Sequence, residues 1–239
     1  MELTITKRDG TKELFNADRI NRSIERACYG TIDPIAKVTQ VATDTKVTLY
    51  NGITTEELDL ATINAAVQNI KEDPDYDKIA TRLLLKTVYK HVLGDYGDSQ
   101  DQLRKLHQEN FPSYVKKAVA GGILDKRMAE NFDLERLSQT LNISRDELFI
   151  YAGLSSLLDR YSIKDKKQKP FEVPQYFFMR VAMGLSYNEK NPTEMAKKFY
   201  NKMSRLEYIA GGSTNLAAGT IRPALSNCFL MEIHDDMEH

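Results

Sequence analysis

The chain has 239 residues, of which 41% are hydrophobic and 28% charged, so it can fold around its own core as one or two domains. Its 33 lysines and arginines nearly balance 34 aspartates and glutamates, which excludes a strongly basic nucleic-acid-binding protein and an acidic disordered chain. The two cysteines, Cys28 and Cys228, cannot build a disulfide framework or a cysteine-rich zinc site. No apolar run approaches the roughly 18 residues of a membrane span, and the first residues are not a targeting signal. We therefore expect a cytoplasmic protein with neither a membrane nor a nucleic acid as partner.

A small hairpin and a helix are predicted at the start of the chain. Residues 3–7 and 13–15 have the character of short strands, and Asp9-Gly10 between them supplies the positive φ of a tight turn. Asn16 then stands where an N-cap belongs, before apolar residues at helical spacing: Ile20, Ile24 and Ala27. The pattern predicts a β-hairpin followed by a first helix.

Three further helices are predicted from their start signals. An Asp-Pro pair at 33–34 opens the second helix, and a capping box of Thr54 and Glu57 opens the third. A second Asp-Pro pair at 73–74 precedes the fourth, whose apolar residues recur at helical spacing. The expected first unit is a β-hairpin that caps a four-helix bundle.

Changes in composition divide the rest of the chain. Residues 95–102 are polar and lack periodicity, so we place a domain boundary there and assign residues 1–94 to the first domain. Helical patterns continue through a second domain, residues 95–208. From residue 209 the chain is rich in small and turn-forming residues, and residues 228–233 then have the pattern of a buried strand. Residues 209–239 form the third part.

Charged and polar residues gather around the predicted hairpin turn. No Walker-type glycine loop and no GxGxxG motif is present, so any phosphate site must be built differently. Lys7, Arg8 and Arg19 could hold phosphates, and Glu13 and Asn16 could bind a ribose or a base. Charged residues around a surface turn are usually only solvated, and the cluster alone leaves both interpretations open. The histidine spacing fits no metal motif, so we expect no metal ligands from the protein.

Six sequence blocks together resemble one family. Residues 6–20 (TKRDGTKELFNADRI), 49–59 (LYNGITTEELD) and 74–92 (PDYDKIATRLLLKTVYKHV) resemble the ATP-cone of ribonucleotide reductase large (alpha, catalytic) subunits. Residues 173–185 (VPQYFFMRVAMGL), 213–220 (STNLAAGT) and 225–237 (LSNCFLMEIHDDM) resemble the opening of the catalytic subunit in class I and class II enzymes. The resemblance implies a mainly α chain: an ATP-cone, a helical domain and the first strand of a ten-stranded α/β barrel.

The resemblance also implies an allosteric site. In that family the cone is an on/off site where ATP activates and dATP inhibits, each bound with Mg²⁺. Carried over by position, the effector pocket comprises Ile5, Lys7, Arg8, Glu13, Phe15, Asn16, Arg19, Ile20, Thr55, Leu58, Asp59 and Lys90. Asp59 resembles the eukaryotic-type subunits, whereas some bacterial relatives carry a histidine there. Lys86 stands where those relatives have an aromatic residue, so that wall of the pocket departs from their pattern.

Further residues match positions of the catalytic subunit. Cys228 matches a redox-active cysteine that reduces the substrate ribose, whereas by residue type alone a free cysteine at the start of a buried strand is usually a small core residue. Thr214 matches a substrate-phosphate contact, and Asn227 stands where many relatives have a serine. Asp235 and Met237 match the start of the specificity-effector site. The second redox cysteine, the thiyl-radical cysteine and the radical-path tyrosines have no counterpart before the chain stops at residue 239.

The resemblance favours the N-terminal part of a ribonucleoside-diphosphate reductase large subunit, split or truncated and inactive alone. Its implied partners are the C-terminal remainder, a ribonucleotide substrate, a second copy of the chain, and a radical source, either a small subunit with a metal-radical centre or adenosylcobalamin. A stand-alone nucleotide-sensing regulator is the second hypothesis, although the zinc ribbon of that repressor family needs paired CxxC motifs that this chain lacks. A helical interaction module without a ligand is the third.

Overall fold

The computed structural model describes residues 3–94, 96, 99–165, 167–228 and 230. Contacts divide the chain into two compact units. The first unit comprises Met1–Asp95 together with Asp146–Leu157, and the second comprises Tyr96–Arg145 and Leu158–His239. Among the described residues, every helix is too short or too polar to cross a membrane.

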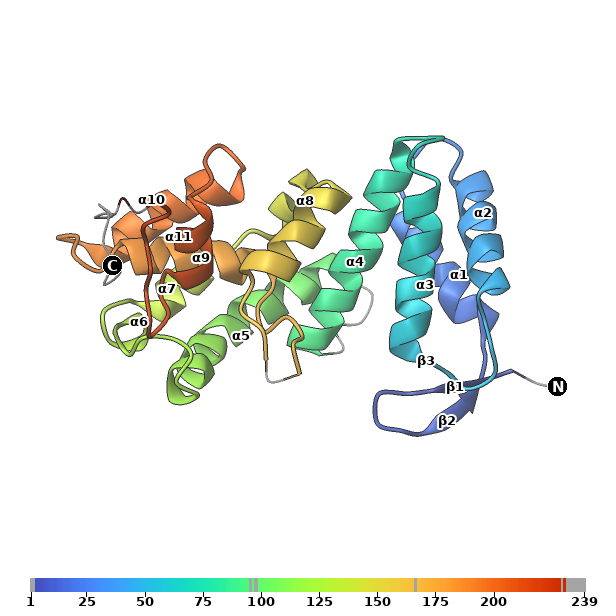
Figure 1. Cartoon of the computed structure of the whole chain (residues 1–239), viewed down its shortest axis with the longest axis horizontal. Coiled ribbons are helices and arrows are strands. Elements are labelled where there is room, and N and C mark those ends of the chain that lie inside the picture. Colours follow the sequence, from blue (N-terminus) through green and yellow to red (C-terminus); the bar gives the residue numbers. More distant parts are fainter. Residues whose placement is uncertain (1–2, 95, 97–98, 166, 229, 231–239) are drawn as a thin grey trace, which may run out of the picture. The chain divides into compact units, whose positions relative to one another are not determined.

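Four helices build the body of the first unit, and Figure 1 shows them side by side: α1 (Ala17–Ala27), α2 (Pro34–Val47), α3 (Thr55–Gln68) and α4 (Asp75–Leu93). The predicted caps are present: the Asn16 side chain accepts a hydrogen bond from the Asp18 amide, and Thr54 and Glu57 form the capping box. The apolar faces meet in a core that includes Ile24, Val41, Ile63 and Ile79. The predicted four-helix arrangement is confirmed.

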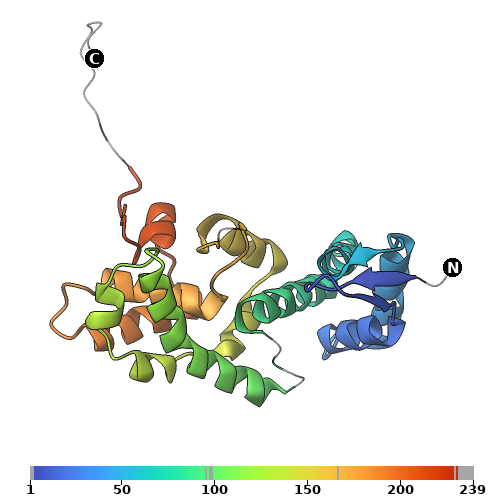
Figure 2. The same ribbon diagram turned by 90° about the horizontal axis from the view of Figure 1, so that it is seen from below.

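The sheet of the first unit has one strand more than the predicted hairpin. Strands β1 (Thr4–Thr6) and β2 (Lys12–Leu14) pair antiparallel around the turn at Gly10, where φ is 84°. Strand β3 (Ile53–Thr54) pairs in parallel with β1, giving the order β2-β1-β3. Two residues are too short for an alternating pattern, so the sequence could not reveal β3. The sheet lies across one end of the helices (Figures 1 and 2).

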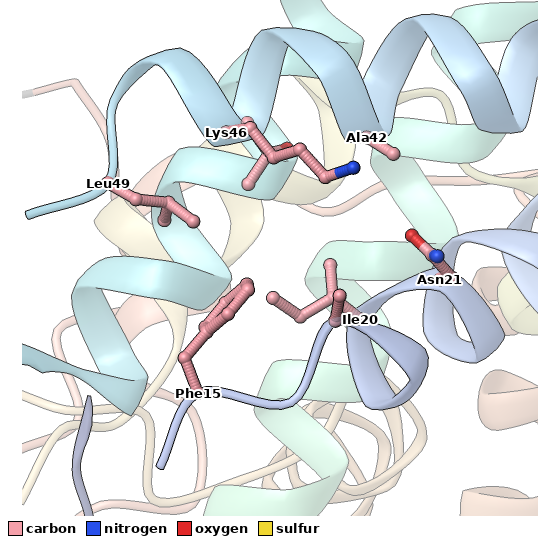
Figure 3. Close-up of a pocket in the computed structure, with 8 residues that line it drawn as sticks. Phe15, Ile20, Asn21, Ala42, Lys46 and Leu49 are labelled. Carbon is pink, nitrogen blue, oxygen red and sulfur yellow. The ribbon is translucent and has the colours of Figure 1, made fainter. Parts of the chain in front are cut away.

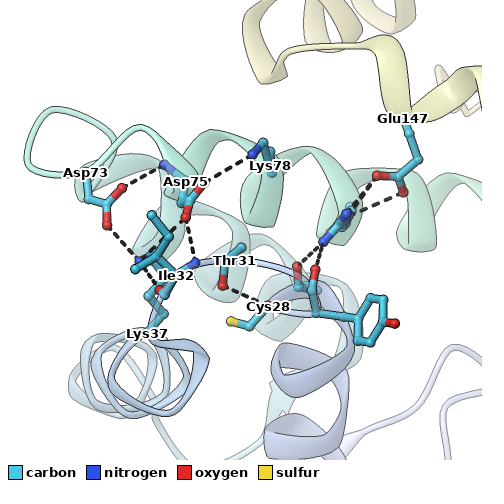
Figure 4. Close-up of polar contacts among 11 residues, drawn as sticks. Cys28, Thr31, Ile32, Lys37, Asp73, Asp75, Lys78 and Glu147 are labelled. Carbon is cyan, nitrogen blue, oxygen red and sulfur yellow. Dashed lines mark hydrogen bonds and ion pairs between the residues drawn. The ribbon is translucent and has the colours of Figure 1, made fainter.

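Charged side chains fix the loop between α1 and α2 (Figure 4). The buried Lys37 ammonium lies 2.7 Å from the Asp73 carboxylate and donates to the Ile32 carbonyl. The hydrogen bond with Asp73 raises the pKa of Lys37. On the other side of the loop, Arg82 of α4 donates to the carbonyl oxygens of Ala27 and Tyr29. The loop is therefore held to α4 and to the turn that precedes it.

The first unit also takes in residues that we expected in the second domain. Helix α8 (Tyr151–Ser156) packs against α4, and its first amide donates to the Asp77 carboxylate. The Tyr89 hydroxyl donates to the Asp146 carboxylate, and Arg82 lies 2.9 Å from Glu147. These contacts join residues more than fifty positions apart, which helical periodicity cannot show. The assignment of residues 146–157 to the 95–208 domain therefore differs from the contacts of the chain.

The second unit is helical, and its elements are α5 (Gln100–Ala120), α6 (Arg127–Glu130), α7 (Leu134–Ser138), α9 (Pro174–Leu185), α10 (Pro192–Ser204) and α11 (Gly212–Ala217). A 3₁₀ helix, η1 (Ile143–Leu148), and a π-helical turn, η2 (Leu157–Tyr161), lie at its borders with the first unit. Helix α9 is buried along nearly all its length and packs against α10 and α11. The ring of Tyr176, on α9, meets the ring of Phe111 edge-on and that of Tyr114 at a tilt.

The predicted buried strand at residues 228–233 is not formed where the structure describes it. Residues 225–228 are exposed and irregular, and Leu230 is fully exposed; residues 229 and 231–233 lie outside the described residues. A strand needs a paired neighbour to be stable, and the described part of the chain offers none beside this segment. The interpretation of Cys228 as a buried core residue is therefore wrong, because Cys228 is exposed.

Candidate functional site

The hairpin brings three of the predicted site residues into one ion-pair group. Glu13 of β2 pairs with Ile5 of β1, and Lys7 follows directly after β1, with its Nζ 2.6 Å from the Glu13 carboxylate. Arg19, in the first turns of α1, reaches the other Glu13 oxygen at 2.9 Å. The hydrogen bond from Lys7 lowers the pKa of Glu13. One ionised carboxylate thus holds two partly exposed cations at the edge of the sheet.

A second charged group surrounds Asp59 of α3. Burial raises the pKa of this half-buried carboxyl, whereas the positive charges of Lys86, Lys90 and Arg8 act in the opposite direction. Arg8 also lies 3.9 Å from Glu56, one turn earlier on α3. Arg8 follows Lys7 directly, so the hairpin connects the Glu13 group with the Asp59 group. Cations from the hairpin and α4 therefore converge near the start of α3.

The predicted apolar residues lie next to these charges. Ile5 and Leu58 are buried in a small core with Ile53, and Phe15 and Ile20 pack against that core from the rim. Ile5 and Leu58 therefore support the site from beneath, whereas Phe15 and Ile20 are only half-buried. Thr55, the first residue of α3, is also half-buried.

Phe15 and Ile20 line a small pocket between α1 and α2 (Figure 3), with an empty volume of about 190 Å³. The lining residues are Phe15, Ala17, Ile20, Asn21, Ala42, Thr45, Lys46 and Leu49. The α2 wall of the pocket was not predicted from the sequence. Its members at 42, 45 and 46 have the spacing of one helix face, and Leu49 follows two residues after α2 ends. Spacing alone does not show which helix that face meets.

The predicted substrate residues lie in the second unit, around α11. The Thr214 hydroxyl donates to the Leu225 carbonyl at 3.0 Å, and the Asn227 side-chain oxygen accepts from the Ser213 amide at 2.7 Å. A Cβ on Gly211 would lie 1.9 Å from the Asn227 amide nitrogen, so this approach requires glycine. These contacts hold residues 225–227 beside α11, with the exposed Cys228 directly after them. Asp235 and Met237 lie outside the described residues.

Among the described residues, no three His, Cys, Asp or Glu side chains lie close enough together to hold a metal ion. The Asn16 side-chain oxygen is already used in capping α1, which leaves its amide nitrogen as the donor available to a ligand.

Two segments of the chain match known protein families. Residues 3–91 match the ATP cone domain, and residues 147–223 match the all-alpha domain of ribonucleotide reductase. Between the two matches lie residues 92–146, which include α5, α6 and α7.

Individual relatives match almost the whole chain. The ribonucleoside-diphosphate reductase subunit alpha of Chlamydia muridarum is 33% identical over 235 residues, which are 98% of this chain and 22% of the relative. The subunit alpha of Helicobacter pylori strain 26695 is 32% identical, covering 99% of this chain and 29% of the relative. The large subunit of Danio rerio is 29% identical, covering 97% of this chain and 28% of the relative. The chain thus spans between a fifth and a third of the length of these relatives. It belongs to the ribonucleotide reductase large-subunit family and carries the ATP cone of that family followed by its all-alpha domain.

Proposed function

We propose that the first unit binds ATP and dATP, each with Mg²⁺, as allosteric effectors. The observation that carries this proposal is the convergence of Lys7, Arg8 and Lys90 around the carboxylates of Glu13 and Asp59, within a segment that matches the ATP cone. Like charges repel one another, so cations that are merely solvated are not expected to cluster from two separate elements. A polyphosphate supplies the negative charge that such a group attracts.

The neighbouring groups suit the remaining parts of a nucleotide. Phe15 and Ile20 present half-buried apolar surface to an adenine ring. Glu13 and Asn16 offer polar atoms to the ribose or the base edge. A bound triphosphate would also compete with Glu13 for Lys7 and Arg19, which now lie within 2.9 Å of its carboxylate. Nucleotide binding and rearrangement of the hairpin charges are thus coupled in this proposal.

Titration of the chain with ATP and dATP in the presence of Mg²⁺ tests the effector site. We expect both nucleotides to bind, and AMP to bind at least about tenfold more weakly because it lacks the phosphates that the cations would hold. Isothermal calorimetry measures all three affinities. Equal affinity for AMP and ATP would show that the cation group is not used. Absence of binding would instead favour the helical interaction module.

We further propose that the second unit contributes to a reductase active site that the remainder of a large subunit completes. Cys228 would be one of two cysteines that reduce the ribose, with Thr214 and Asn227 beside the substrate. The support is that residues 225–227 are hydrogen-bonded to α11 while Cys228 itself stays exposed and available to react. Asp235 and Met237 would begin the specificity-effector site. The implied partners are the C-terminal remainder, a small subunit or adenosylcobalamin as the radical source, a ribonucleotide and a second copy of the chain.

Complementation tests this second proposal. The chain alone should not reduce CDP, and turnover should appear when it is mixed with the C-terminal remainder of a related large subunit and a radical source. Cys228→Ser should assemble but abolish multiple turnover. The reason is that two thiols give up two electrons and two protons when they form a disulfide, and a hydroxyl cannot replace one of them. The measurement is dCDP formation over several turnovers.

Cys28 provides the matched control, because it is buried in the first unit and burial raises the pKa of its thiol to about 11. Cys28→Ala should therefore keep turnover, after correction for any loss of stability. Near wild-type turnover by Cys228→Ser would remove Cys228 from the catalytic set.

A further inference from the structure

We propose that Lys86 is an additional phosphate-binding residue of the effector site, and that it gives the site a preference for nucleoside triphosphates over diphosphates. This inference rests on the proposed function of the first unit as a nucleotide site. The twelve positions assigned to the effector site by resemblance do not include Lys86.

Lys86 lies on the same face of α4 as Lys90, a predicted effector-site residue. The two lysines are four residues apart, so both project from one face of the helix. The Lys86 Nζ donates to the Ser23 hydroxyl of α1 at 2.5 Å, so the side chain points from α4 toward α1. Its half-buried setting holds the ammonium at the site rather than in bulk solvent.

Positive charges outnumber negative ones around Asp59. Lys86, Lys90 and Arg8 act on its carboxylate together with Glu56, so three positive side chains stand against the two acidic ones, Asp59 and Glu56. Glu56 lies 3.9 Å from Arg8 and its side chain is 46% exposed, so water weakens its attraction for the other two cations. Among these five side chains the positive charges therefore outnumber the negative ones, next to a half-buried carboxylate. A γ-phosphate adds both negative charge and acceptor oxygens to what a diphosphate offers.

One hydrogen-bond partner of Lys86, the Ser23 hydroxyl, is a neutral acceptor. A phosphate oxygen forms a stronger hydrogen bond with an ammonium than a hydroxyl does. Exchange of this one hydrogen bond for a bond to a bound phosphate is therefore favourable. The competing explanation is that Lys86 only ties α1 to α4, in which case its loss would affect folding and not the choice between nucleotides.

Calorimetry of the full chain with Mg·ATP and with Mg·ADP separates the two explanations. Lys86→Met should weaken ATP binding about tenfold or more, as expected for a lost hydrogen bond to a charged group, and weaken ADP binding less. The ATP-to-ADP affinity ratio should therefore fall. Lys86→Arg, which keeps the cation, should restore most of the ratio.

Two control variants sharpen the result. Ser23→Ala removes the link between α1 and α4 but keeps the cation, so the ratio should stay at the wild-type value. Lys71→Met removes a cation whose side chain is 80% exposed and should change neither affinity. Thermal melting shows whether each variant is folded at the temperature of the titration.

An unchanged ATP-to-ADP ratio in a folded Lys86→Met variant would overturn this inference, and so would an identical fall in Ser23→Ala. Either result would leave the effector site itself intact, because the wild-type chain would still bind ATP. A wild-type chain that binds neither nucleotide would overturn the proposed function instead.

Discussion

Replacing Lys7 and Arg8 together by alanine should weaken ATP binding by about a hundredfold or more. Each side chain is expected to make a charge-assisted contact with the triphosphate, worth about 1.5–3 kcal/mol, and the loss of two such contacts corresponds to roughly that change in affinity. Both side chains are partly exposed at the hairpin, so the fold should tolerate their removal. Isothermal calorimetry of the double variant with Mg·ATP is the measurement.

Lys12 supplies the matched control for this experiment. It lies on β2 of the same hairpin and is exposed, but it is outside the predicted effector set. Lys12→Ala removes an equal charge, so any general electrostatic attraction of ATP falls by a similar amount per residue. We expect a change of about twofold or less. A double Lys7/Arg8 variant with wild-type ATP affinity would contradict the assignment of the hairpin cations to the phosphates.

Raising the salt concentration should separate the two parts of the site. The cations at the hairpin are partly exposed, so their attraction for a polyphosphate is screened by salt. The apolar surface of Phe15 and Ile20 is not sensitive in this way. If phosphate contacts dominate, the ATP affinity of the wild-type chain should fall as the salt concentration rises. The ATP affinity of the double Lys7/Arg8 variant should fall less, because that variant lacks two of the screened cations.

Local chemistry explains which parts of the fold were predictable from the sequence. Asn16 caps α1, Thr54 and Glu57 form a capping box, and Gly10 takes the positive φ of the hairpin turn. Each of these features depends on residues within four positions of one another, so the sequence contains all the information they need. The same holds for the apolar faces of the first four helices.

Contacts between distant residues explain what the sequence could not show. Strand β3 exists because Ile53 and Thr54 pair with β1, almost fifty residues earlier. Helix α8 joins the first unit because its amide meets Asp77, and Arg82 meets Glu147. The charged residues of the hairpin were singled out from the sequence, and Asp59 and Lys90 were added by resemblance, whereas the α2 wall of the pocket depends on the packing of α1 on α2.

Residue 228 shows the limit of pattern-based prediction most clearly. The apolar run after Asn227 is typical of a buried strand, but burial requires neighbouring strands that the described residues do not provide. The exposed cysteine that results is consistent with a surface to be covered on assembly, as the proposed function requires. A local sequence pattern thus indicates the conformation that a segment favours, but the segment becomes a strand only where neighbouring strands can pair with it.

A buried ion pair organises the second unit around Arg180 of α9. Arg180 and Glu172 are both fully buried, and their side chains meet at 2.9 Å. The Tyr114 hydroxyl donates to the same carboxylate at 2.6 Å, and burial together with the charge of Glu172 raises the pKa of Tyr114 well above its ordinary value, so the hydroxyl keeps its proton. Arg180 also donates to the carbonyl oxygens of Ala218 and Asn215. One guanidinium therefore joins α9 to the C-terminal part of α11, the helix that carries Thr214.

Removing this guanidinium should be the most destabilising single substitution in the second unit. Arg180→Met leaves the Glu172 carboxylate buried without its cation, and breaking a buried pair in this way costs about 3–5 kcal/mol of unfolding free energy. Arg180→Lys should also lose stability, because a lysine cannot reach Glu172, Ala218 and Asn215 at once from a single ammonium. Denaturant unfolding of the full chain, followed by circular dichroism, measures both.

The double variant Arg180→Met with Glu172→Gln distinguishes a lost ion pair from lost packing. Neutralising Glu172 removes the buried unpaired charge, so the double variant should recover part of the stability that Arg180→Met alone loses.

Arg205→Met, at an exposed arginine 3.8 Å from Glu207, should change stability by about 0.5 kcal/mol or less. ATP affinity should stay within about twofold in every one of these variants, because Arg180 and the effector site belong to different units. If Arg180→Met unfolds at the wild-type denaturant concentration, the guanidinium does not hold the Thr214 segment, and the hydrogen bonds of α11 to residues 225–227 must be sufficient on their own.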